Sequence, residues 1–179
     1  MNDQSFFLQP FLPAGPLHYL KITGRIVRQS NKLIIQYKLS GPLAELVIPA
    51  LADIPARKKA LWEETCFEFF IGAINSSRYR EFNLSPAGHW NVYSFNAYRQ
   101  GMQEEQAFQA LPFSVRMQPD NLVLSLELDL GKVIPVNQAI EVAVSAVIKP
   151  LSGNLTYWAL THPGPQADFH LRNSFIIDL

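Results

Sequence analysis

The 179-residue sequence has a single cysteine, no excess of charge of either sign and no long apolar run. Since Cys66 has no second cysteine to pair with, no disulfide can form within the chain. Lysine plus arginine and aspartate plus glutamate number 15 each, so no net field attracts nucleic acid or an anionic membrane. No stretch approaches the roughly 18 apolar residues of a membrane span, and residues 1–7 lack the basic and apolar regions of a signal peptide. We therefore expect a cytoplasmic protein without nucleic-acid or membrane partners.

The sequence also lacks the short motifs of the common enzyme classes. It contains no nucleophile elbow and no phosphate-binding loop. The spacing of His162, Asp168 and His170 matches no known type of metal site, and the rigid turn at residues 163–165 explains it structurally. These absences favour a binding protein over an enzyme, and we expect no metal.

Alternating apolar and polar residues are the most regular pattern in the chain. Residues 122–130 carry leucine at every second position, and residues 140–148 repeat the pattern with isoleucine, valine and alanine. This period is typical of half-buried strands, and turn residues separate such segments at short intervals. The pattern predicts an all-β antiparallel sandwich in one domain over 1–179. The proline-rich segment 1–16 is expected to be an extended N-terminal arm before the first strand.

One predicted strand, within residues 61–71, contains a carboxylate among aromatic residues. Because successive side chains of a strand face opposite ways, Glu68 should face away from Phe67 and Phe69. A carboxylate in aromatic surroundings needs hydrogen-bond donors, or its pKa rises. Trp62 shares the face of Glu68 if the strand extends back that far, and Glu81 lies on the next predicted strand. The segment therefore favours a site for a polar ligand held partly by stacking.

Several side chains suit a saccharide, because aromatic rings bind its C–H face while carboxylates and amides bind its hydroxyls. Each tryptophan has the competing interpretation of a core side chain, and we expect Trp158 or Trp90 to be the buried one. The predicted ligand-binding residues are Trp62, Glu68, Glu81, Asn83, Trp90, Trp158 and His162.

Three segments carry a family resemblance. Residues 61–70, with the letters LWEETCFEFF, resemble the tryptophan–acidic–cysteine–glutamate strand of the DOMON-like and carbohydrate-binding family 9-like domains. Residues 79–88 are similar to the second strand and turn of that group. Residues 157–163, with Asp168, Phe169 and His170, resemble the C-terminal block of its bacterial DOMON-like members.

The resemblance spans the chain from about residue 17 to the end. It implies an immunoglobulin-like sandwich of roughly ten strands that binds ligands rather than transforming them. By position, the resemblance makes Trp62 the first stacking ring, Glu68 the hydroxyl-binding carboxylate and Trp158 a candidate second ring.

The predicted function is a non-catalytic small-ligand binding module, with a saccharide or similar polar ring compound as ligand and no cofactor. One alternative is a hydrolase with Glu68 and Glu81 as acid and base, although hydrogen bonding of the pair or ion pairing with Arg80 or Arg99 also explains them. A structural or interaction domain without a ligand is another alternative. The last is a haem-binding protein, with axial ligands among Met102, Met117, His89, His162 and His170.

Overall fold

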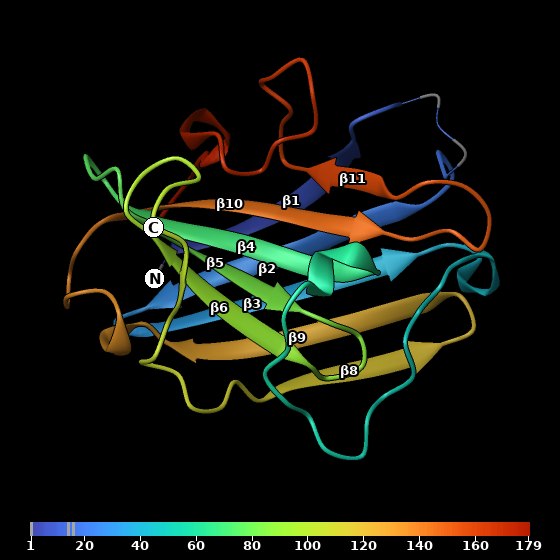
Figure 1. Cartoon of the computed structure of the whole chain (residues 1–179), viewed down its shortest axis with the longest axis horizontal. Helices are drawn as coiled ribbons and strands as arrows, with labels where there is room; N and C mark the ends of the chain where they lie inside the picture. The colour runs from blue at the N-terminus through green and yellow to red at the C-terminus, as the bar shows by residue number, and fades with distance from the viewer. Residues whose placement is uncertain (1, 14, 16) are drawn as a thin grey trace.

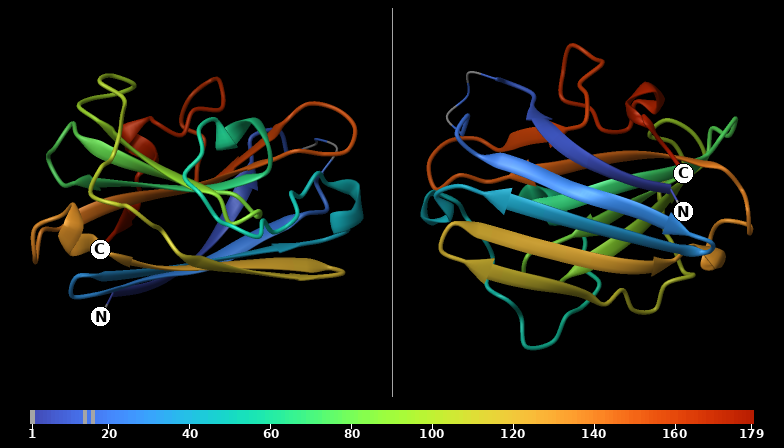
Figure 2. Two further views of the ribbon diagram at one scale, coloured as in Figure 1. Left: turned by 60° about the horizontal axis from the view of Figure 1, so that its bottom comes forward. Right: turned by 180° about the vertical axis from the view of Figure 1, so that it is seen from behind.

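Two antiparallel β-sheets lie face to face in this protein (Figures 1 and 2). The computed structural model describes residues 2–13, 15 and 17–179. Twelve strands and four short 3₁₀-helices occupy these ranges, which contain no α-helix. The expected all-β sandwich is therefore confirmed, while its description as immunoglobulin-like stays a prediction. Within the described ranges, no helix has the length and apolar character that a membrane crossing requires.

Sheet A has the strand order β1–β2–β3–β9–β8. The buried residues of β3 and β9 alternate with exposed or half-buried ones, because one face of this sheet meets sheet B and the other meets solvent. The strands are β1 (Asn2–Pro10), β2 (Lys21–Gln29), β3 (Lys32–Ser40), β9 (Asn121–Asp129) and β8 (Phe113–Gln118).

Sheet B has the order β7–β6–β5–β4–β10–β11, and β12 pairs with one end of β10. Its central strands are buried on both faces, which indicates that the outer face is also covered. The strands are β7 (Gln103–Glu104), β6 (Trp90–Phe95), β5 (Tyr79–Leu84), β4 (Cys66–Ala73), β10 (Ile140–Ile148), β11 (Thr156–Ala159) and β12 (Ile177–Asp178).

Strand β1 connects the two sheets. Its residues 2–8 pair with β2 in sheet A, and its last residues, Gln9 and Pro10, pair with β11 in sheet B. The prediction of an N-terminal arm over 1–16 is therefore wrong for residues 2–10. The prolines that suggested an arm begin only at Pro10, where the strand ends. Among residues 3–10, only Phe6 and Leu8 have buried side chains, too few to show the strand period clearly.

The core between the sheets contains the alternating apolar residues of the two segments 122–130 and 140–148. The even-numbered leucines of β9 and the even-numbered apolar residues of β10 are buried there, as the alternation predicted. Phe69 of β4 stacks on Phe82 of β5, with ring centroids 4.4 Å apart. Tyr37 of β3 is fully buried, and its hydroxyl donates a hydrogen bond to the backbone carbonyl of Glu68 across the sandwich at 2.8 Å.

A short 3₁₀-helix, η2 (Leu61–Glu63), carries Trp62 just before β4, where an extension of the predicted strand was considered. Another, η1 (Leu43–Glu45), follows β3. Ala60 takes a left-handed backbone conformation with φ of 57°, and the Glu63 N–H bonds to its carbonyl at 3.1 Å, so the chain turns before β4 begins. The other two are η3 (Leu130–Lys132) and η4 (Arg172–Ser174).

Candidate ligand-binding site

The outer face of sheet B carries a row of polar side chains. Ser145 of β10, Glu68 of β4, Asn83 of β5 and Asn91 of β6 are register partners across four adjacent strands, so their side chains lie on the same face. Residues 67, 69 and 71 of β4 face the core on the opposite side. The predicted orientation of Glu68, away from its odd-numbered aromatic neighbours, is therefore confirmed.

Three segments cover this polar face on the side away from sheet A (Figure 2, left). They are η2 with Trp62, the loop 96–102 after β6, and the loop 160–171 after β11. Asp168 joins the two loops, because it accepts hydrogen bonds from the Arg99 guanidinium at 3.0 Å and from the Tyr98 hydroxyl. Its Oδ1 also accepts from the His170 backbone N–H at 3.0 Å, a hydrogen bond within the loop 160–171.

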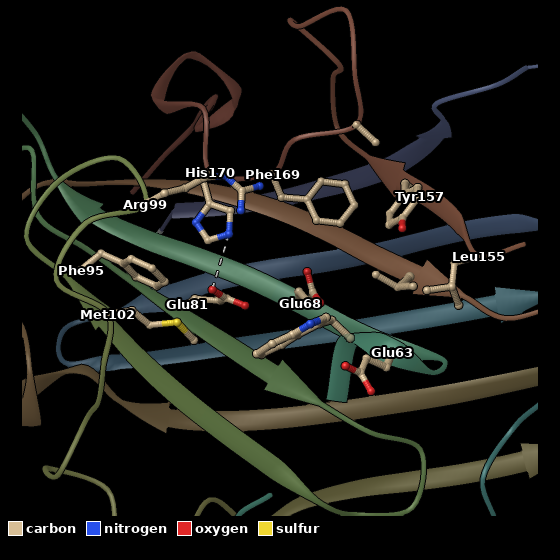
Figure 3. Close-up of a pocket in the computed structure, with 13 residues that line it drawn as sticks. Glu63, Glu68, Glu81, Phe95, Arg99, Met102, Leu155, Tyr157, Phe169 and His170 are labelled. Carbon is tan, nitrogen blue, oxygen red and sulfur yellow. Dashed lines mark ion pairs between the residues drawn. The ribbon is translucent and has the colours of Figure 1, made fainter. Parts of the chain in front are cut away.

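A cavity of about 360 Å³ lies between the covering segments and the sheet (Figure 3). This volume is within the range of about 300–1,000 Å³ usual for small-ligand sites. Aromatic and ionisable side chains make up most of its lining: Trp62, Phe95, Tyr157 and Phe169, with Glu63, Glu68, Glu81, Arg99 and His170.

Glu68 lies at the floor of the cavity with only 2 % of its surface exposed. Its Oε2 accepts a long hydrogen bond of 3.4 Å from the Ser145 hydroxyl, whereas its buried Oε1 has no hydrogen-bond partner among the described residues. Burial raises the pKa of Glu68 well above its usual value, and the neighbouring carboxyl of Glu81 raises it further. An unsatisfied buried oxygen costs about 1–3 kcal/mol, so the floor is prepared for a polar partner from outside the chain.

Glu81 and His170 lie together beside Glu68 (Figure 3). Glu81 is 5 % exposed and accepts a hydrogen bond of 2.8 Å from the Asn83 amide. Burial raises its pKa to about 7, although the Asn83 hydrogen bond and the charge of Arg99 act in the opposite direction. The His170 Nε2 is 3.8 Å from Glu81 Oε2, too far for a direct hydrogen bond. Burial lowers the pKa of His170 to about 4, with Arg99 lowering it further, so its imidazole is neutral near pH 7.

The arginines expected as ion-pair partners of these carboxylates bind elsewhere. Arg80 pairs with Glu105 at 2.8 Å, and Arg99 pairs with Asp168 at 3.0 Å. The alternative in which Arg80 or Arg99 forms an ion pair with Glu68 or Glu81 is therefore wrong. Both carboxyls keep the ability to interact with a ligand.

Aromatic rings form the walls above the carboxyls. Trp62 extends from η2 and meets the Tyr93 ring edge-on, with centroids 5.8 Å apart. Phe169 and Tyr157 form a second pair with centroids 6.1 Å apart, and the Tyr157 ring is partly open to solvent. Figure 3 shows Phe169 and Tyr157 on the far side of Glu68 from Met102 and Phe95. The arrangement combines flat apolar surfaces with hydrogen-bonding groups at their base.

The structure brings three of the seven predicted site residues into this cavity. Trp62, Glu68 and Glu81 line it, although Trp62 does so from a 3₁₀-helix and not from the strand of Glu68. Asn83 is fully buried beneath them, where it orients Glu81 through the hydrogen bond described above. Asn83 therefore contributes to the site only through Glu81.

The other three predicted residues lie outside the cavity. Trp90 and Trp158 are 4 % and 1 % exposed and belong to the core between the sheets, in agreement with the expectation that a tryptophan at one of these positions is buried. The Trp158 indole N–H donates to the Thr156 hydroxyl at 3.0 Å. His162 lies against the N-terminal strand, with its Nε2 2.8 Å from the Gln9 carbonyl oxygen. The prediction that these three share one site with Glu68 is therefore not met.

Several residues that line the cavity are absent from the predicted site, among them Arg99, Tyr157, Phe169 and His170. The C-terminal block that carried the family resemblance contains Tyr157, Phe169 and His170, and this block was the available signal. Arg99 had no local signal, because its position depends on the contact with Asp168, 69 residues further along the chain.

Two of the five candidate haem ligands lie at this cavity. Met102 and His170 line it, whereas His89, His162 and Met117 do not. The macrocycle would place an extended apolar surface over the buried Glu68 and Glu81, leaving the free Glu68 oxygen without a partner. Among the described residues, no group of three or more histidine, cysteine, aspartate or glutamate side chains is arranged to hold a metal ion.

Solved structures of carbohydrate-binding proteins share this fold. A candidate carbohydrate-binding protein from Bacteroides uniformis superposes with a TM-score of 0.74 at 13 % identity, over 96 % of this chain and 84 % of that one. A carbohydrate-binding module of family 9 from Caldicellulosiruptor kristjanssonii, in complex with glucose, superposes with a TM-score of 0.51 at 9 % identity, over 88 % of this chain and 76 % of that one. No protein-family model and no curated protein sequence matches the chain. The likeness shows a fold that carbohydrate-binding proteins use.

Proposed function

We propose that this chain is a non-catalytic binding module whose ligand is a saccharide or a similar polar ring compound. The observation that carries the proposal is the free Oε1 of Glu68, buried at the floor of an aromatic-walled cavity. A sugar hydroxyl both donates and accepts hydrogen bonds, so it can pair with this oxygen in either protonation state of the carboxyl, while the ring lies against an apolar wall. The carbohydrate-binding fold of the two solved structures supports the same ligand class.

Trp62 has a defined role in this proposal. Its half-buried ring lines the cavity, and its contact with Tyr93 is T-shaped at an interplanar angle of 62°, so the two rings do not stack on each other and the Trp62 ring is assigned to the ligand. An aromatic contact of this kind contributes about 0.5–1.5 kcal/mol beyond the area that it buries. Trp62 therefore provides the stacking surface, and Glu68 and Glu81 provide the polar contacts.

Calorimetric titration of a panel of mono- and disaccharides tests the proposal. Binding by the parent protein is expected to weaken roughly tenfold or more in Trp62→Ala. Phe7→Ala is the matched control, because Phe7 is 44 % exposed on β1 of sheet A, away from the cavity. Silence across the whole panel, or equal binding by a folded Trp62→Ala variant, would contradict the proposal.

Carboxylate-based hydrolysis is a second candidate function, favoured by one observation. The pKa of Glu81 is raised to about 7 by burial, which suits a general acid that works near neutral pH. Incubation with a set of aryl glycosides tests this candidate. Turnover that is lost in Glu68→Gln and in Glu81→Gln would favour the hydrolase, and absence of turnover across the set would exclude it for these substrates.

A further inference from the structure

The carboxyls that line the cavity are not balanced by cations. Glu63 lies at its exposed rim, and Glu68 and Glu81 lie at its buried floor. The cationic side chain of the lining, Arg99, forms its ion pair with Asp168 outside this acidic group. The charge of Arg99 lowers the pKa of Glu81 from a distance, but neither carboxyl of the floor has an arginine or lysine ion-pair partner among the described residues.

Four further titratable groups around the floor are uncharged near neutral pH. Burial raises the pKa of Cys66 on β4, of Tyr79 on β5 and of Tyr93 on β6, the last to about 12. From the loop 160–171, His170 faces Glu81, and burial lowers its pKa to about 4. None of these four groups supplies a positive charge to the carboxyls.

Glu68 has a buried oxygen for which the described residues provide no hydrogen-bond partner. Its side chain is 98 % buried, since 2 % of its surface is exposed, and its Oε1 makes no hydrogen bond within the described residues. A sugar hydroxyl would pair with this oxygen but carries no charge that favours the ionised form of the two carboxyls. An ammonium group carries three donors together with a positive charge, so it meets both requirements.

The walls of the cavity also suit a cation. Aromatic faces carry negative electrostatic potential and attract ammonium groups placed over them. Trp62, Tyr157 and Phe169 contribute such rings to the lining, which also contains the two carboxyls. Charge and ring surface therefore favour the same kind of ligand.

We infer that the ligand is an amino sugar with a free amine, whose ammonium group lies between Glu68 and Glu81 while its ring rests against Trp62. The inference rests on the proposed saccharide function and narrows its ligand class. Binding of the ammonium favours the ionised form of both carboxyls, so protons held by Glu68 and Glu81 in the free protein leave for the solvent.

Calorimetry with three matched sugars tests the inference: glucosamine, glucose and N-acetylglucosamine, which share one ring and differ at one substituent. Each titration is run near pH 7 in two buffers of different ionisation enthalpy. Glucosamine is expected to bind about tenfold tighter than either neutral sugar and to release up to about one proton per molecule bound. The neutral sugars are expected to release none.

Two isosteric variants locate the effect. Glu68→Gln and Glu81→Gln should each reduce the preference for glucosamine and the proton release. Glu127→Gln is the control, because Glu127 is an exposed residue of β9 in sheet A, paired with Lys32 at the surface, and both readouts should be unchanged in it. Circular dichroism confirms that each variant is folded; the comparison of the three sugars on the parent protein needs no variant.

The outcomes separate the two proposals. Equal binding of glucosamine and glucose without proton release would overturn the amine inference and leave saccharide binding standing. Binding of cyclohexylamine with proton release, in the absence of binding by any sugar, would support a cationic ligand and overturn the saccharide function. No binding of any of these compounds would overturn both.

Discussion

Replacing Glu81 by glutamine is expected to change how the stability of the protein depends on pH. The pKa of Glu81 rises from 4.5 to about 7 on folding because the carboxyl is buried. Since the folded state then holds the proton more tightly than the unfolded state, this group stabilises the fold fully below pH 4.5, and the contribution is lost as pH rises through 7. A shift of this size corresponds to about 3 kcal/mol of unfolding free energy at alkaline pH. The glutamine side chain of the variant cannot ionise, so its burial does not lower the unfolding free energy as pH rises.

The quantity to measure is the difference in unfolding free energy between Glu81→Gln and the parent, from urea titrations at pH values between about 4 and 8. The comparison is made as a difference because Glu68 and His170 titrate in both proteins. His170 acts in the opposite direction, since its lowered pKa removes stability as pH falls from 6.5 to about 4. The variant should match the parent near pH 4 and exceed it by about 3 kcal/mol near pH 8.

Glu127→Gln provides the control for this experiment. Glu127 is exposed and pairs with Lys32 at the surface, so its replacement should change stability by less than about 1 kcal/mol at any pH. A Glu81→Gln variant that follows the parent in parallel from acid to alkaline pH would refute the reasoning, because the carboxyl would then have the same proton affinity in both states.

Three further substitutions test the packing and the division between core and site. Tyr37→Phe removes the buried hydrogen bond to the Glu68 carbonyl and should cost about 1–3 kcal/mol in urea unfolding; an unchanged midpoint would contradict this contact. Gly24→Ala would place a methyl group 2.1 Å from a backbone oxygen of the adjacent strand and should destabilise by about 1–3 kcal/mol or more, so a soluble variant with the melting temperature of the parent would argue against the close approach. Trp158→Ala should lower the unfolding free energy by about 3–5 kcal/mol because its ring is buried in the core. Trp62→Ala should lower the unfolding free energy far less and should weaken ligand binding. Equal losses of stability in the two variants would show that both rings belong to the core.

The strands of the sandwich could be predicted where one physical rule decides the structure. Side chains of a strand alternate between two faces, so the leucine stripe of residues 122–130 defined β9, and the stripe of 140–148 defined β10. The same rule placed Glu68 on the face opposite Phe67. Strand β1 was missed because its polar residues and terminal proline resemble a linker, and its pairing with β2 and β11 depends on partners elsewhere in the chain.

The candidate site could be predicted only in part, since its residues come together through contacts between distant segments. Glu68 and Glu81 are neighbours on paired strands, and the pattern of the two strands was enough to associate them. His170 reaches Glu81 through the loop that Asp168 holds to Arg99, and no local pattern encodes that contact. Trp90 and Trp158 were included in the predicted site because the sequence does not show which tryptophans the opposite sheet covers. Their burial becomes evident only in the assembled sandwich.

The double pairing of β1 bears on how the protein forms during synthesis. Gln9 of β1 pairs with Ala159 of β11, and β4 pairs with β10 on one side. Sheet B is therefore incomplete, and the end of β1 unpaired, until most of the polypeptide has left the ribosome. The segments synthesised first therefore expose apolar side chains and unpaired strand edges to solvent or to a chaperone. Contacts between such remote positions also slow folding. Nascent chains arrested before residue 140 should therefore remain sensitive to protease, whereas chains arrested with residue 179 well clear of the ribosome should resist it.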